Sequence, residues 1–200
     1  MPPIEVRPAT HRDAPTLAPA LARAFHDDPV MRWVFPSEAH RLRSGPRFWR
    51  SVVRQHLHHE GAKGWTTSDG AGLALWAAPD RWQPSFLTLL REAPHFAFAL
   101  RHRIPRGVRC MTAIESHHPS EPHWYLAVLA TDPPHQRRGV ASTLLAPILE
   151  ECDADGWPAY LETATEANVA FYRRHRFEVT GEITVPGGGP TVWLMWRDPR

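Results

Sequence analysis

A short basic turn stands directly before a predicted helix. The run 136–141 (QRRGVA) leads into a helical pattern over 142–151. Free backbone N–H groups and the helix dipole attract phosphate at such an N-terminus, and the two arginines add positive charge. Gly139 and Ala141 leave room for a ligand to approach the backbone. A solvated turn could have the same sequence, and the glycine-rich fingerprints of dinucleotide and nucleoside-triphosphate loops are absent.

The elements around this turn alternate in type. Residues 124–131 (WYLAVLAT) form an apolar run of strand length, which predicts a strand buried on both faces. After the helix, the patterns predict a strand over 158–163, a helix over 166–175, and strands over 177–185 and 191–196. This order predicts an α/β fold with a sheet of mixed direction.

The first half of the chain has weaker patterns. Asp27-Asp28-Pro29 ends the first helix, and residues 30–36 are interpreted as an aromatic loop or turn. Pro46 is expected to break the second helix, and Pro94 the third. The predicted elements are a strand over 4–7, helices over 13–26, 37–60, 84–104 and 106–117, and hairpin strands over 64–67 and 72–77.

Composition excludes several classes of protein. The 200 residues suit a single domain over 1–200, with 42% hydrophobic and 22% charged residues. No apolar stretch approaches the ~20 residues of a membrane span, and the N-terminal residues lack the apolar core of a signal peptide. A net charge of +2 argues against a nucleic-acid binder. The two cysteines, Cys110 and Cys152, are expected to be reduced thiols of a cytoplasmic protein.

Two groups of histidines have spacings that zinc sites use. They lie within 56–59 and 117–123, but neither has the acidic or cysteine partners of a recognisable ligand set. We therefore expect no metal site. His123, next to the strand over 124–131, is a candidate substrate-side base or binder.

Two runs carry a more specific signal. HWYLAVLATDPPHQRRGVASTLL (123–145) and YLETATEANVAFYRRHRFEVTGE (160–182) resemble two motifs of the GCN5-related N-acetyltransferases, the GNAT family. Within that family, the stretch is most similar to the puromycin N-acetyltransferases. The resemblance implies a mixed, mostly antiparallel sheet flanked by helices, with splayed fourth and fifth strands. It also implies an acceptor side over 1–122 and an acetyl-CoA side over 123–200.

The resemblance further implies where acetyl-CoA binds. The amides of the turn and first helical residues would hold the pyrophosphate, and the exposed backbone of the splayed strand would pair with pantetheine. An asparagine on the next helix would contact the pantetheine arm. The residues implied are Leu129, Ala130, Thr131, Arg137, Arg138, Gly139, Val140, Ala141, Ser142 and Asn168.

Two side chains are candidates for acid and base catalysis. Tyr172 would lie near the sulfur and protonate the leaving thiolate, unless it is simply a core aromatic residue. Glu162, placed at a strand end beside the cofactor helix, would take the proton of the amine, although a structural carboxylate, His123 or a water relay are alternatives. Arg176 stands where the family often has glycine, so the end of this helix is expected to be built differently.

These residues predict an enzyme that transfers acetyl from acetyl-CoA to a primary amine by direct attack. The acceptor expected from the resemblance is a small molecule, an aminonucleoside or an antibiotic-like amine. A protein or peptide N-terminus is the alternative acceptor, and a non-catalytic acyl-CoA-binding regulatory module is the alternative of another class. Neither nucleic acid nor a membrane is an expected partner, and a homodimer is left open.

Overall fold

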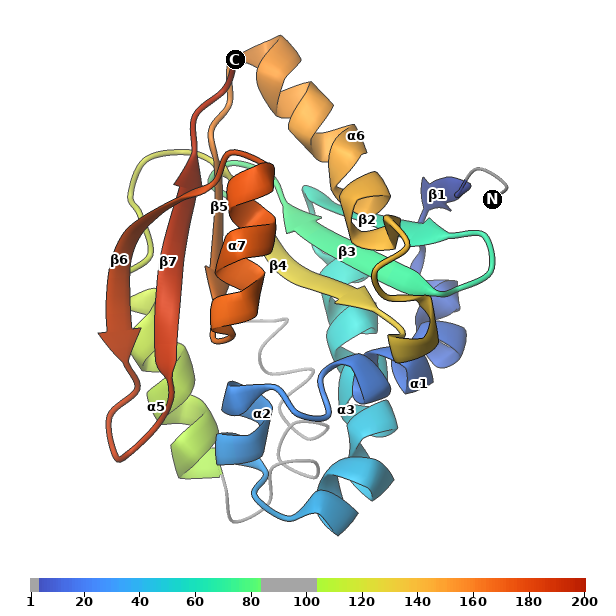
Figure 1. The fold of residues 1–200 in the computed structure, drawn as a ribbon, viewed down its shortest axis with the longest axis vertical. Coiled ribbons are helices and arrows are strands. Elements are labelled where there is room, and N and C mark those ends of the chain that lie inside the picture. Colours follow the sequence, from blue (N-terminus) through green and yellow to red (C-terminus); the bar gives the residue numbers. More distant parts are fainter. Residues whose placement is uncertain (1–3, 84–103) are drawn as a thin grey trace.

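A computed structural model describes residues 4–83 and 104–200 (Figure 1). Seven strands form one sheet in the order β1-β2-β3-β4-β5-β7-β6, with helices on both faces. The elements are β1 Val6–Pro8, η1 His11–Asp13, α1 Ala14–Ala24, α2 Pro29–Val34, α3 Glu38–His58, β2 Ala62–Thr67, β3 Gly72–Ala77, α5 Ile104–Glu115, β4 Trp124–Thr131, η3 Pro133–His135, α6 Val140–Asp155, β5 Ala159–Thr163, α7 Glu166–Arg174, β6 Glu178–Thr184 and β7 Thr191–Arg197.

The sheet is mostly antiparallel, as predicted. Only β4 and β5 run parallel among these neighbouring pairs. Their pairing covers Trp124–Leu126 against Ala159–Leu161 and stops there, although both strands continue. The two strands therefore diverge, which confirms the splay expected at this point. The edge of β4 that faces β5 is left unpaired beyond Leu126, with its backbone groups directed into the gap.

A β-bulge in β4 determines which residues face which layer. Leu75 pairs with Val128 and Trp76 pairs with Leu126, so the register skips Ala127. Before the bulge, Leu126 packs with α6; after it, Val128 packs with α1 and α3. The extra residue reverses the alternation of side chains, because strand residues point to opposite faces in turn. Leu129 is thereby placed on the α6 side, at the start of the splayed segment.

Helices cover the sheet in two layers (Figure 1). On one face, α6 and α7 bury Trp76, Leu161 and Phe177. On the other face, α1 and α3 cover β3 and β4, and α5 packs through Cys110 against β5, β6 and β7. The two layers enclose both faces of the central strands, which explains why β3 and β4 are so apolar.

Two predictions for the first half were wrong. Residues 29–34 form helix α2, because Asp28 caps it by accepting the N–H of Met31 at 2.9 Å and Pro29 occupies the first helical position. Pro46 does not break α3, which is continuous from Glu38 to His58. Packing of Trp49 and Val53 into the core outweighs the missing N–H of the proline.

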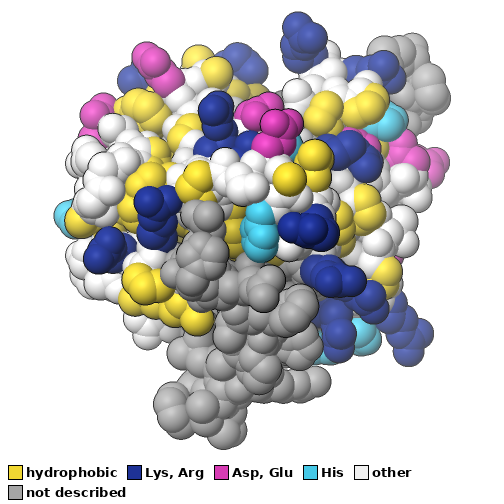
Figure 2. Space-filling view, turned by 90° about the horizontal axis from the view of Figure 1, so that it is seen from below, with side chains coloured by type: hydrophobic (Ala, Val, Ile, Leu, Met, Phe, Trp, Pro, Cys, Tyr) yellow, Lys and Arg dark blue, Asp and Glu magenta, His cyan; other side chains and the backbone are white. Residues whose placement is uncertain are grey.

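The lower end of the molecule has a mixed surface. Lys and Arg side chains lie beside hydrophobic ones on the face seen from below (Figure 2). On α5, the side chains of Ile104, Val108 and Met111 are exposed. Within the described residues, no helix has the length and apolar character that crossing a membrane would require. Most of the predicted helix over 84–104 lies outside the described residues.

Candidate active site

The turn before α6 has the backbone conformation of an anion-binding loop. Gly139, the N-cap of α6, has φ of 88°, and Arg137 has φ of 60°. The first helical hydrogen bond runs from Thr143 N–H to the Gly139 carbonyl, at 3.0 Å. The N–H groups of Val140, Ala141 and Ser142 precede that bond, so they are the donors that α6 offers to a ligand.

Two contacts hold this turn in place. The Arg23 side chain of α1 makes a two-pronged ion pair with Asp132, with N–O distances of 2.8 and 2.6 Å. The amide nitrogen of Gln136 donates to the Thr131 carbonyl at 3.1 Å. These contacts attach the turn to the end of β4 and to α1, which covers the other face of the sheet.

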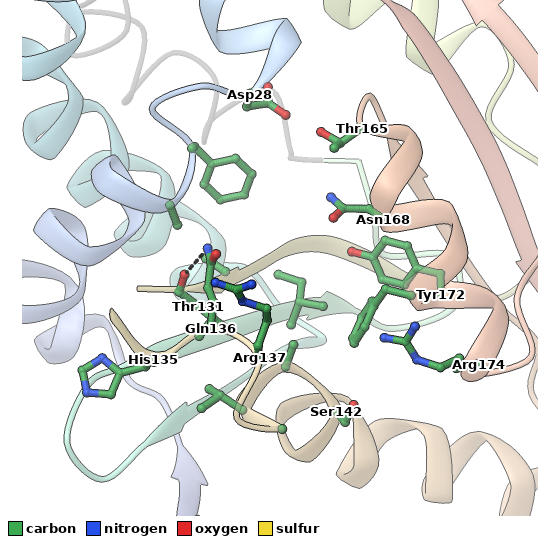
Figure 3. A pocket seen from close by; sticks show the side chains of 18 of the residues that line it. Asp28, Thr131, His135, Gln136, Arg137, Ser142, Thr165, Asn168, Tyr172 and Arg174 are labelled. Atoms are coloured by element: carbon green, nitrogen blue, oxygen red, sulfur yellow. Dashed lines mark hydrogen bonds between the residues drawn. The ribbon is translucent and has the colours of Figure 1, made fainter. Parts of the chain in front are cut away.

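A cavity of about 680 Å³ opens in front of the α6 N-terminus (Figure 3). Its walls are the splayed end of β4, the turn, α7, and the segment that joins α1 to α2. The lining residues are Ala24, Phe25, Asp27, Asp28, Leu129, Ala130, Thr131, His135, Gln136, Arg137, Gly139, Val140, Ala141, Ser142, Thr165, Asn168, Phe171, Tyr172 and Arg174.

The cavity gathers most of the residues selected from the sequence. All of them line it except Arg138, Glu162 and His123. Arg138 is exposed beside the turn. Residues from β4, the turn, α6 and α7 therefore meet around one space, as a shared binding site requires.

Tyr172 and Asn168 project into the cavity from α7 (Figure 3). They lie one helical turn apart, so both side chains point the same way. Asn168 donates to Thr163 Oγ1 at 3.3 Å, which orients its amide. Burial raises the pKa of Tyr172 above its ordinary value of 10.0, so its hydroxyl is protonated at neutral pH and can donate a proton.

Several cavity residues were not selected from the sequence. Phe25, Asp27 and Asp28 come from the α1–α2 segment, more than a hundred residues before the turn. Their spacing carries no signal, because only the tertiary fold brings them here. Phe171 could have been found, since it lies three residues after Asn168 and so on the same side of α7. Arg174 also lines the cavity, from the last residue of α7.

Glu162 lies on the face of the sheet opposite α6. Leu161 packs under α6 and α7, and alternation along β5 therefore turns Glu162 the other way, toward the side covered by α5. The expectation that it lies beside the cofactor helix is wrong for this reason. Its side chain is 7% exposed, and its Oε1 lies 3.5 Å from His118 Nδ1. Glu162 is thus a buried carboxylate.

Arg176 adopts the left-handed conformation that the family usually gives to glycine. Its φ is 69°, and its N–H donates to the Arg173 carbonyl at 2.9 Å. The expectation of a differently built helix end is therefore wrong, because the arginine accepts the strained conformation. A left-handed residue thus closes the end of α7.

The histidines in the described part of the chain do not form a metal centre. No group of three or more His, Cys, Asp or Glu side chains with suitable geometry occurs within 4–83 and 104–200.

Comparison with known proteins decides the family. The acetyltransferase (GNAT) family model matches residues 64–177, more than half of the chain, and this range includes β4, the turn, α6 and α7. The chain belongs to the GNAT family.

Relatives of this GNAT protein agree with that assignment. An uncharacterized N-acetyltransferase of Schizosaccharomyces pombe is 24% identical over 207 residues, which cover 94% of this chain and 81% of the relative. The fold resembles the histone acetyltransferase HPA2 and related acetyltransferase of Corynebacterium glutamicum, with 24% identity, a TM-score of 0.69, and coverage of 98% and 97%. It also resembles arylalkylamine N-acetyltransferase 2 of Aedes aegypti, with 13% identity, a TM-score of 0.62, and coverage of 98% and 99%. The protein is thus a GNAT acetyltransferase, and its family uses acetyl-CoA as the acetyl donor.

Proposed function

We propose that this GNAT protein transfers the acetyl group of acetyl-CoA to the primary amine of a small molecule. One observation carries the proposal: a single cavity joins the free N–H groups of α6, the unpaired edge of β4 and the Tyr172 side chain. A bound acetyl-CoA needs three features in order along its length. These are a phosphate site for its diphosphate, a free backbone edge for its extended pantetheine arm, and a proton donor for its sulfur.

The cofactor would lie across the cavity from its diphosphate to its thioester. The N–H groups of Val140, Ala141 and Ser142, with the guanidinium of Arg137, would hold the diphosphate. Arg138, exposed beside the turn, would add positive charge without lining the cavity. The pantetheine arm would pair with the free backbone of Leu129, Ala130 and Thr131, and Asn168 would contact it from α7.

The reaction would be a direct attack on the thioester. The neutral amine nitrogen forms a bond to the acetyl carbon, the carbonyl becomes an oxyanion, and backbone N–H groups of the splayed strand stabilise it. The carbon–sulfur bond then breaks, and Tyr172 gives its proton to the leaving thiolate. Glu162, through water, would remove the proton of the amine.

The cysteines support direct attack rather than an acetyl-cysteine intermediate. Cys110 and Cys152 are buried, and neither lines the cavity. Burial raises the pKa of Cys110 to about 11 and that of Cys152 to about 12, so both are thiols at neutral pH and poor nucleophiles. Two buried free thiols also suit the reducing cytoplasm in which we place the protein.

The far end of the cavity favours a cationic amine with an apolar body. Phe25, Asp27 and Asp28 line the cavity, and Figure 3 shows Asp28 at the end away from Ser142. A phenyl ring and carboxylates attract a protonated amine that enters with an aromatic group. This chemistry, together with the sequence likeness to puromycin N-acetyltransferases, makes an aminonucleoside our first choice of acceptor.

A screen for thiol release tests the proposal. Purified protein is incubated with acetyl-CoA and amines that include puromycin, arylalkylamines and short peptides with free N-termini. Release of coenzyme A with a small amine, with the acetylated amine identified by mass, is the expected result. Turnover of peptides alone would move the acceptor to a protein N-terminus. Tight binding of coenzyme A without any transfer would favour a regulatory acyl-CoA-binding module.

A further inference from the structure

Three titratable side chains form a buried row on the face of the sheet opposite α6. The side chains of Glu162 and His118 are 7% and 2% exposed, and the residue His123 is 3% exposed. His118 Nδ1 lies 3.5 Å from Glu162 Oε1, and its Nε2 lies 3.1 Å from His123 Nε2. His123 Nδ1 in turn contacts the backbone carbonyl of Glu121. The row leads from the proposed base to an exposed loop residue.

The hydrogen-bond partners of His123 and His118 determine which of their ring nitrogens carry protons. A carbonyl oxygen only accepts, so His123 Nδ1 carries a hydrogen and its Nε2 is the acceptor when the ring is neutral. His118 Nε2 must then donate to His123. A neutral His118 would consequently turn the lone pair of Nδ1 toward Glu162 Oε1, and two acceptors would face each other. No hydrogen bond joins Oε1 and Nδ1 at 3.5 Å, but a proton on Nδ1 would turn this contact into an ion pair.

We propose that His118 is held as an imidazolium by Glu162 on one side and by the fixed tautomer of His123 on the other, and that it keeps Glu162 ionised as the base. His118 is thus a positioning residue, which acts on the amine only through Glu162. The inference rests on the proposed function for the role of Glu162, while the charge of His118 follows from the row itself.

The surroundings of His118 favour a cation. The ring of Trp82 stacks on it, with centroids 3.7 Å apart and an interplanar angle of 23°. Tyr125 and Tyr160 meet it edge to face at 4.9 and 5.0 Å. A cation over the face of a tryptophan is stabilised by the charge distribution of the ring, more strongly where water is excluded.

The charged neighbours contributed by the packed elements are acidic. Glu115 of α5 acts on Tyr125, and Asp80 after β3 acts on His123. Burial lowers the pKa of His123, and the charge of His118 lowers it further, so His123 is the neutral partner. Burial, then the charge of Glu162, raises the pKa of Tyr125 and Tyr160, which stay phenols.

An ionised Glu162 matters because of where it lies. Its Oε1 is buried without a hydrogen-bond partner among the described residues. Burial penalises the charged form of a carboxylic acid unless an opposite charge lies close to it. The imidazolium of His118 removes that penalty, so that Glu162 remains free to accept the proton of an amine.

Nitrogen NMR of the histidine rings tests the charge directly, without any acceptor. The His118 signals are assigned by their loss in His118→Phe. In the wild type at neutral pH, both ring nitrogens of His118 should carry protons. In Glu162→Gln, Nδ1 should lose its proton, since the amide can donate to it. A neutral His118 in the wild type, or the same spectrum in both proteins, would overturn the proposal.

The pH dependence of acetyl transfer separates a positioning role from a structural one. In His118→Phe, the pH at which kcat/KM reaches half its maximum should rise by about one unit, a tenfold loss at lower pH with recovery at high pH. His118→Asn, which keeps an N–H donor, should restore part of the shift. An equal loss of kcat/KM at every pH would mean that His118 contributes packing alone. If no amine is acetylated, the proposed function fails, and the NMR result still decides the charge of His118.

Discussion

Ser142 Oγ lies 2.9 Å from Nε2 of His175, and Ser142 lines the cavity. The contact joins the first turn of α6 to the C-terminal end of α7, so the two helical walls of the acetyl-CoA site are linked by one hydrogen bond. Burial, then the charges of Arg174 and Arg197, lowers the pKa of His175. The ring is therefore neutral at pH 7, and one of its nitrogens accepts or donates toward the serine.

This lowered pKa predicts how stability depends on pH. The unfolded chain takes up a proton near the ordinary value of 6.5, whereas folded His175 resists it until a lower pH. The free energy of unfolding should therefore fall as the pH drops below 6.5. Urea titrations of the wild type and His175→Gln at pH 7.5 and 5.5 measure the effect, and the variant should lose less stability between the two values.

Some of the fall should remain in His175→Gln. His56 and His123 also have a pKa lowered by burial, so they contribute in the same direction. An identical fall in both proteins would show that His175 does not titrate differently on folding.

The two glycines that cap α6 offer a matched test of the turn. Gly139 is the N-cap of α6 with φ of 88°, and Gly156 is its C-cap with φ of 74°. Changing either to alanine should cost about 1 kcal/mol of unfolding free energy, because an L-residue is strained there. Only Gly139→Ala should also weaken coenzyme A binding, by about tenfold, since it alters the backbone that presents the N–H groups. Calorimetry and urea titration measure the two quantities, and equal coenzyme A affinity in both variants would contradict the assignment.

Removing the Tyr172 hydroxyl should separate chemistry from binding. In Tyr172→Phe, the rate of acetyl transfer should fall by about 10²-fold, because the leaving thiolate loses its proton donor. The dissociation constant for coenzyme A should change by less than about threefold, since the ring still fills the wall. Steady-state kinetics with the best amine of the screen measure the rate. An unchanged rate would leave Tyr172 as a packing residue.

A glycine in place of Arg176 should stabilise the protein. The exposed arginine has φ of 69°, and relief of that strain outweighs the greater freedom of glycine in the unfolded chain by about 0.5–1 kcal/mol. Arg173→Gly, in the helical part of α7, should instead cost about 1 kcal/mol. Thermal unfolding of both variants checks the opposite signs, and a loss in Arg176→Gly would show that the arginine side chain makes a stabilising contact.

Local patterns explain why the second half could be predicted from the sequence. The apolar run of β4, the glycine that caps α6 and the apolar spacing of α6 are each determined by neighbours in the chain. The same kind of signal precedes α2, where Asp28 caps the helix and Pro29 opens it, but a helix of six residues has too short an apolar pattern to be predicted. Pro46 was misjudged because the packing of Trp49, which outweighs a local rule, is a tertiary contact.

In the candidate site, too, some residues could be predicted from local patterns and others depend on the tertiary fold. Residues 137–142 could be selected because a basic, glycine-containing turn before a helix is a local pattern, and Tyr172 because its run resembles a family motif. The contribution of Phe25 and Asp28 depends on α1 and α2 folding over the end of β4, which no short pattern records. The face of Glu162 was readable from the alternation around Leu161, but its contact with His118 depends on the loop that follows α5.

A crystal structure with coenzyme A bound tests the central claim most directly. The account predicts the diphosphate within hydrogen-bond distance of the N–H groups of Val140, Ala141 and Ser142, and the pantetheine arm against the free edge of β4. A diphosphate bound elsewhere, or a cofactor that leaves the α6 N-terminus untouched, would contradict it.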